Sequence, residues 1–191
     1  MGKGRLEAFS DGVIAIIITI MVLELKVPHG AQLSALLPLV PVMLSYVLSF
    51  GNVGIYWNNH HHMLQAVSRV DGTILWANLH FLFWLSVMPF VTAWMGENHF
   101  DTIPVAIYGA VLWMSGFSYF LLSKALTRHH GKDSKLARAV GNSSKEIVSL
   151  VIYTVSIPAA FIHPWLACGL FVAVAIMWLL PDRRIENLLA E

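Results

Sequence analysis

The sequence predicts an all-α integral membrane protein with six transmembrane helices. Two observations support this fold class. Hydrophobic residues make up 57% of the chain and charged residues only 12%, which is about half the usual charged share of a soluble domain. The apolar residues also form blocks long enough to cross lipid. We therefore expect a single membrane domain over residues 1–191, embedded in the lipid bilayer of the cell membrane.

Hydropathy and chain-breaking residues divide this domain into six predicted spans. Proline and glycine separate several of them, as in the segment Val27–Gly30 after the first span and in His163-Pro164 before the last. The expected boundaries are roughly 6–27, 34–59, 72–95, 103–126, 146–163 and 165–181.

The positive charges are distributed unequally between alternate loops. If the N-terminus is inside, eleven of the 12 Lys and Arg residues fall on the cytoplasmic side and only Lys26 falls outside. The positive-inside rule then places both termini in the cytoplasm, which requires an even number of spans. The formal net charge of +1 gives no sign of a nucleic-acid partner.

The first predicted span contains an acidic residue, Asp11, about one turn inside an otherwise apolar helix. A carboxylate at that depth is costly and needs a polar partner or water. Asp11 lies about 140° around the helix from Ile16. We therefore expect it to be buried against the second or third span in a structural packing role. The candidate partners are Asn78, His80, Asn58, Asn59 and a neighbouring arginine, with Ser10 adding a hydroxyl.

An apolar stripe lies nearly opposite this acid. Ile16, Ile20 and Leu23 fall within about 60° of arc, and the same spacing adds Phe9, Val13 and Val27. Such a stripe is more often part of a packed core than the lining of a pore. Almost every position from 12 to 23 is apolar, so several stripes could be drawn on this helix. With Asp11 on the packing side, we instead expect the stripe to face whatever the first helix surrounds.

The motif Arg5-x-x-x-Phe9-Ser10-Asp11, followed five residues later by Ile16, resembles the signature of the transmembrane protein 175 family of potassium channels. The prokaryotic members of that family resemble this chain over its whole length, with one six-span unit and cytoplasmic termini. One departure is Gly12 directly after the acid, which makes the start of the helix more flexible or more closely packed.

The resemblance implies a homotetramer whose first helices surround a central pore. Ile16 would form the narrowest apolar ring, Ile20 and Leu23 would follow toward the outer mouth, and Thr19 would match a polar position that favours K⁺ over Na⁺. Four converging isoleucines gate by dewetting, so we expect a weakly K⁺-selective cation channel. Monovalent cations, with K⁺ permeant, are its expected ligands, without a cofactor or enzymatic activity. Arg5 is expected to pair with a carboxylate, because a ring of cations opposes cation entry.

The principal alternative is a proton-coupled secondary transporter that uses Asp11 and the membrane histidines as a relay. The run His60-His61-His62 lacks the i, i+4 spacing that brings two histidines to one metal on a helix. We expect this run to be a cytoplasmic interfacial cluster, and a membrane enzyme built on it is a more distant alternative. No catalytic residue and no metal site is predicted.

Overall fold

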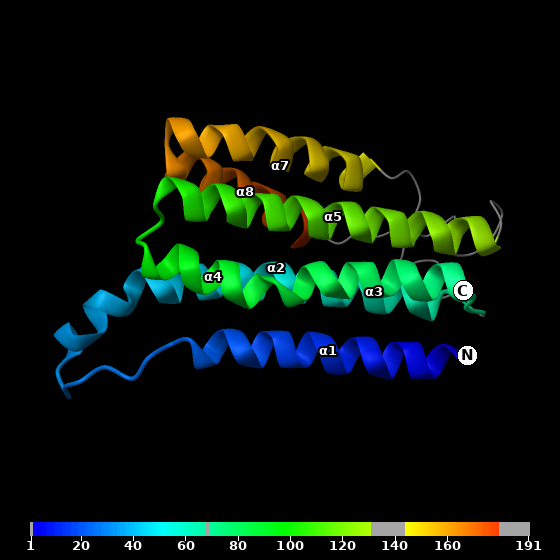
Figure 1. The fold of residues 1–191 in the computed structure, drawn as a ribbon, viewed down its shortest axis with the longest axis horizontal. Helices are drawn as coiled ribbons and strands as arrows, with labels where there is room; N and C mark the ends of the chain where they lie inside the picture. Colours follow the sequence, from blue (N-terminus) through cyan, green and yellow to red (C-terminus); the bar gives the residue numbers. More distant parts are fainter. Residues whose placement is uncertain (1, 68, 131–143, 180–191) are drawn as a thin grey trace.

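A computed structural model describes residues 2–67, 69–130 and 144–179 of the chain. Its helices run back and forth through one bundle, with α1 at one edge and α7 at the other (Figure 1). They are α1 (Lys3–Leu23), the 3-10 helix η1 (Leu33–Leu39), α2 (Val40–Gln65), α3 (Gly72–Ser86), α4 (Met88–Glu97), α5 (Thr102–His130), α7 (Ser144–Ile162) and α8 (Pro164–Leu179). The predicted all-α class is confirmed for these residues.

Helices occupy all six predicted positions, but several boundaries differ from the prediction. Among the described residues, five helical segments are long and apolar enough to cross a membrane, and α8 is a shorter apolar helix. The first helix ends at Leu23, so Val27 does not continue the stripe on a helix. The second continues to Gln65, and the third is interrupted between Ser86 and Met88.

Local chemistry explains these boundaries. The last turns of α2 remain helical because one face is buried, with His60, Met63 and Leu64 at i, i+3 and i+4. The interruption between α3 and α4 lies just before Pro89, which has no N–H to continue the helical hydrogen bonds. The start of α3 is fixed by Asp71, whose side chain accepts a hydrogen bond from the backbone N–H of residue 74 at 2.9 Å.

The core of the bundle lies around α5, which contacts α3, α4, α7 and α8. Its largest fully buried aromatic side chains are Phe81, Tyr108, Tyr153 and Phe171. The first helix adds one buried face to this core and packs against α2, α3 and α4. Among the described residues, no helix therefore covers the other face of α1.

At the end of the bundle where α1 finishes, α4 packs closely against α2 and contacts the segment that follows α1. A Cβ atom on Gly96 would lie 2.7 Å from Cα of Val42, so only glycine permits this approach of α4 to α2. Beyond α1, the Lys26 ammonium donates to the carboxylate of Glu97 at 2.8 Å. This hydrogen bond and the charge of Glu97 raise the pKa of Lys26 above its ordinary value.

Candidate functional site

The first helix has one buried face and one exposed face. The buried side chains are Leu6, Ser10, Ile14, Ile17 and Met21. On the other face, the exposed fractions are 50% for Phe9, 58% for Ile16, 42% for Ile20 and 78% for Leu23. These four positions share one side of the helix at 100° per residue. They form a continuous apolar surface, called the α1 stripe below.

Thr19 lies beside the α1 stripe and is also exposed. Its hydroxyl donates a hydrogen bond to the backbone carbonyl oxygen of Ile16 at 2.9 Å. The hydroxyl proton is therefore used within the helix, while the oxygen keeps lone pairs that accept hydrogen bonds or contact cations. Val13, which the sequence pattern assigned to the same stripe, is only partly exposed.

Behind the stripe, a buried chain of side-chain hydrogen bonds joins α1 to α3 and α2. The Asn78 amide donates to the Ser10 hydroxyl at 3.0 Å, and that hydroxyl donates to the carbonyl oxygen of Leu6 at 2.9 Å. Asn78 Oδ1 lies 2.8 Å from Nε2 of His60, so the imidazole donates this bond through an Nε2–H. All three polar side chains are at most 1% exposed.

Asp11 is placed differently from the expectation. It is half-buried rather than buried, and its Oδ1 accepts a hydrogen bond from the indole Nε1 of Trp57 at 2.9 Å. The Trp57 ring in turn stacks on His61, with centroids 5.9 Å apart. The predicted contact of Asp11 with Asn78 or His80 is wrong. Successive residues of a helix point about 100° apart, so Asp11 faces α2 whereas Ser10, one residue earlier, faces α3.

The remaining predicted residues at this end of α1 lie apart from that chain. His80 accepts a hydrogen bond from the Trp84 indole at 3.0 Å. Arg5 is exposed, and no carboxylate pairs with it within the described ranges. Lys3 instead lies 3.6 Å from Glu7 and donates to a carbonyl oxygen at the end of α2.

A second buried polar chain, not selected from the sequence, lies nearer the other end of α1. The Thr92 hydroxyl is 2.7 Å from the Ser49 hydroxyl and 2.7 Å from the carbonyl oxygen of Met88. Ser49 is 3.0 Å from the Tyr108 hydroxyl. Thr92 reaches α1 only through a sulfur contact, at 3.9 Å from Sδ of Met21.

The end of α2 has contacts that the sequence pattern did not predict. Trp57 had no predicted contact, and His60 was expected to belong to an interfacial histidine cluster. Both contact α1 or α3 instead. The signal was present in the spacing, because Trp57, His60 and His61 lie within one turn of a helix that continues through apolar Met63 and Leu64.

The described side chains include no group of three or more His, Cys, Asp or Glu residues that could hold a metal ion. The arrangement instead combines an apolar exposed stripe with a polar, hydrogen-bonded support behind it. Such an element is suited to line a passage or a subunit contact at a fixed rotation, because directional bonds determine which residues face outward.

Comparisons with known proteins agree with the resemblance in the first helix. The family model for the endosomal/lysosomal potassium channel TMEM175 matches residues 5–89. A potassium channel of Chryseobacterium sp. (strain P1-3) is 54% identical over 191 residues, which is 100% of both chains. A potassium channel of Chamaesiphon minutus is 31% identical over 93% of each chain.

The fold points to the same family. The crystal structure of a lysosomal potassium-selective channel TMEM175 homolog from Chamaesiphon minutus matches with a TM-score of 0.82 and 30% sequence identity. The match covers 93% of this chain and 96% of that one. On the strength of its identity to full-length relatives and of this shared fold, the chain belongs to the TMEM175 family of potassium channels, which are multi-pass membrane proteins and ion channels rather than enzymes.

Proposed function

We propose that this chain is a K⁺-permeable cation channel, weakly selective for K⁺ over Na⁺, in which four copies of α1 surround a central pore. The observation that carries the proposal is the α1 stripe. It stays exposed on a helix whose buried face is fixed by the Ser10–Asn78–His60 hydrogen bonds. In a homotetramer, this exposed face would be covered by its own copies around the axis.

The proposed ion path follows from the chemistry of the stripe. Four Ile16 side chains, each 58% exposed in the single chain, would meet at the narrowest ring and exclude bulk water. Ile20 and Leu23 would form further apolar rings toward the outer mouth, and Thr19 would supply a polar oxygen between them. K⁺ sheds water more easily than Na⁺, so such a constriction favours K⁺ modestly without a carbonyl filter.

We propose a cell-membrane protein with six spans, α8 being the sixth, and with both termini cytoplasmic. Helices α1, α3 and α7 start at one end of the bundle, where α2 and α5 finish (Figure 1). That end carries all described basic residues except Lys26: Lys3, Arg5, Arg69, Lys124, Arg128 and Lys145. This asymmetry supports the orientation through the positive-inside rule.

The contacts favour a channel over the proton-coupled transporter. A relay through Asp11 would need hydrogen-bonded contact between its carboxylate and a histidine. Instead Asp11 accepts from the Trp57 indole, and His60 is engaged by Asn78. The family assignment supports the same choice.

Potassium flux from liposomes tests the proposal directly. The purified full-length chain should release K⁺ down its gradient without a coupled ion, at a rate that follows the membrane potential. Valinomycin added at the end defines complete release. Protein-containing liposomes that lose K⁺ no faster than empty ones would refute the channel.

Substitution Ile16→Asn tests the position of the constriction. A polar side chain in the narrowest ring should raise conductance and lower the K⁺ preference over Na⁺, because the ring then holds water. The matched control is Val22→Asn, which is also exposed on α1 but lies about 120° away from Ile16. If the two variants have the same permeability ratio as the unsubstituted channel, Ile16 is not in the filter.

A further inference from the structure

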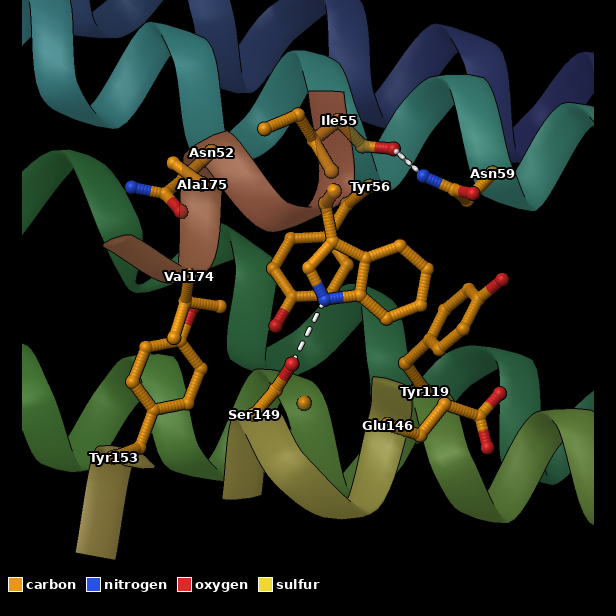
Figure 2. Close-up of a pocket in the computed structure, with 12 residues that line it drawn as sticks. Asn52, Ile55, Tyr56, Asn59, Tyr119, Glu146, Ser149, Tyr153, Val174 and Ala175 are labelled. Atoms are coloured by element: carbon orange, nitrogen blue, oxygen red, sulfur yellow. Dashed lines mark hydrogen bonds between the residues drawn. The ribbon is translucent and has the colours of Figure 1, made fainter. Parts of the chain in front are cut away.

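Each α-helix of the described chain buries some of its residues against the others. Beside the pocket between α2, α5, α7 and α8, for example, Ser149 of α7 accepts a hydrogen bond from the Trp178 indole of α8 at 2.8 Å (Figure 2). The 3-10 helix η1 differs, because none of its residues is buried. The segment of residues 27–39, which contains η1, is called the η1 arm below.

The η1 arm is apolar although it is exposed. Leu33 is 85% exposed and Leu37 69%, and Val27 at the start of the arm is exposed as well. No Lys, Arg, Asp or Glu occurs between Lys26 and Arg69 in the sequence. A helix with apolar residues on every side is normally covered by protein or lipid. The arm therefore needs a partner that the described chain does not supply.

The arm has a defined place at the end of the bundle. At its base, the Lys26 ammonium donates to the carboxylate of Glu97 at the end of α4, at 2.8 Å. Gly30 has a φ of +146°, which glycine adopts without strain, where the arm turns toward η1. The backbone N–H of Ala35 then donates to the carbonyl oxygen of Gln32 at 3.0 Å. These contacts position η1 relative to α2 and α4.

The position of the charged groups separates η1 from the hydrocarbon of the bilayer. The Lys26–Glu97 pair is exposed, and such a pair lies outside the hydrocarbon because lipid does not solvate charge. The start of α2 is at the same level, since Val42 lies against Gly96, the residue before Glu97. Helix η1 precedes α2 and extends beyond the end of α1 (Figure 1). Lipid tails are therefore not available to cover η1.

The arm lies on the side where the proposed pore would bring four copies together. The α1 stripe ends at Leu23, a few residues before the arm. In Figure 1, η1 slants from the start of α2 toward the side of the bundle on which α1 lies. With four copies of α1 around one axis, four η1 helices would surround the same axis beyond the ends of α1.

The leucines of η1 are distributed as a ring of copies requires. A 3-10 helix has three residues per turn, so Leu33 and Leu36 share one side and Leu37 lies about 120° away. Both sides are exposed. In a ring, each copy meets its two neighbours through two different surfaces, and these leucines give each surface an apolar residue. Identical charges near the axis would repel one another, and η1 has none.

We propose that the η1 arms of adjacent copies pack against one another and form a collar at the outer mouth of the tetramer. The partner of the arm is a second copy of this chain, with Leu33 and Leu36 of one copy facing Leu37 of the next. This inference rests on the proposed tetramer, and it adds a contact between subunits that lies outside the α1 stripe.

Spin-label accessibility in liposomes tests the collar. Cys168 is the single native cysteine, so the full chain with Cys168→Ala and Leu37→Cys carries one label per copy. The references are Val151→Cys on α7 for lipid and Asn98→Cys after α4 for water, both at exposed positions. The label at residue 37 should be several-fold less accessible to oxygen than the lipid reference. It should also be several-fold less accessible to a water-soluble nickel complex than the water reference.

Subunit exchange between fluorescently labelled tetramers in detergent gives a second readout. Leu37→Gln should speed exchange by at least about tenfold, because each contact between neighbours loses apolar surface. It should not unfold the chain, since η1 has no buried residue. The matched control is Ile103→Gln, which is exposed at the start of α5 at the same end of the bundle and should leave the exchange rate unchanged.

The possible results separate the collar from the proposed channel. Oxygen accessibility equal to that of the lipid reference would place the arm in the bilayer, and nickel accessibility equal to that of the water reference would leave it in solvent. Either result, or unchanged subunit exchange in Leu37→Gln, overturns the collar. Neither readout depends on ion flux, so a tetramer with a protected arm that passes no K⁺ would refute the channel alone. A chain that forms no tetramer would overturn both.

Discussion

The two halves of α1 are held against the rest of the chain by different kinds of contact. In the first half, Ser10 and Asp11 make side-chain hydrogen bonds to α3 and α2. In the second half, Ile14, Ile17 and Met21 are buried by apolar packing, and within the described part of the chain the polar contact to another helix is the Thr92 hydroxyl on the sulfur of Met21 at 3.9 Å.

The difference indicates how α1 is aligned within the bundle. Apolar packing sets the distance between helices but tolerates small rotations, whereas a hydrogen bond is lost when its geometry changes. The first half of α1 therefore sets the rotation of the helix, and the second half mainly sets its distance from α4. Three experiments test this division.

Breaking the buried hydrogen bonds of the first half should have the largest effect. Asn78→Leu removes two side-chain hydrogen bonds and leaves His60 buried without its acceptor. We expect a loss of about 2–4 kcal/mol in the free energy of unfolding, together with a changed K⁺/Na⁺ permeability ratio. Denaturant unfolding and liposome flux measure the two effects.

The control for this substitution is Asn58→Leu on the exposed side of α2, which should change unfolding by less than about 0.5 kcal/mol. An Asn78→Leu protein with unchanged stability and selectivity would show that the hydrogen bonds do not align α1.

Removing the hydroxyl of Thr92 should have a smaller and purely structural effect. Thr92→Val loses the contacts with Ser49 and the Met88 carbonyl, at a cost of about 1 kcal/mol. Thr92→Ser keeps the hydroxyl and should cost less. Because Thr92 only touches α1, both variants should retain the original permeability ratio. A shift in that ratio for Thr92→Val alone would contradict the proposed division.

The bond between Trp57 and Asp11 should contribute least to stability, since both side chains are partly exposed. A double-mutant cycle with Trp57→Phe and Asp11→Asn should give a coupling energy of about 0.5 kcal/mol. Thermal unfolding of the four proteins measures it. A coupling energy of several kcal/mol would mean that this contact, rather than Asn78, dominates the support of α1.

Much of this arrangement was predictable from the sequence. Hydropathy located a helical segment at each predicted position among the described residues, and helical spacing placed Ile16, Ile20 and Leu23 on one face, which is exposed. The predicted group of polar residues around Ser10 and Asn78 does contain a direct hydrogen bond. The assignment to a family rested on residues 5–16, where the motif lies.

The partners of individual side chains were not predictable in the same way. The polar run from Asn58 to His62 lowers hydropathy, so the second span was expected to end within it, at residue 59, although the helix continues to Gln65. The neighbour that a polar residue contacts depends on the rotation of its helix. A change of about 100°, the angle between the adjacent residues Ser10 and Asp11, is enough to change that neighbour. Helical periodicity in one chain does not fix that rotation between helices.

The hydroxyl of Thr19 has a consequence for the sign of the charge that the proposed pore admits. Its proton is bound to the carbonyl oxygen of Ile16 in the same helix, so it has none left to offer to an anion. Four such residues around an axis would present lone pairs alone. A chloride ion would meet oxygen without hydrogen there, and exclusion of anions would require no fixed negative charge in the wall.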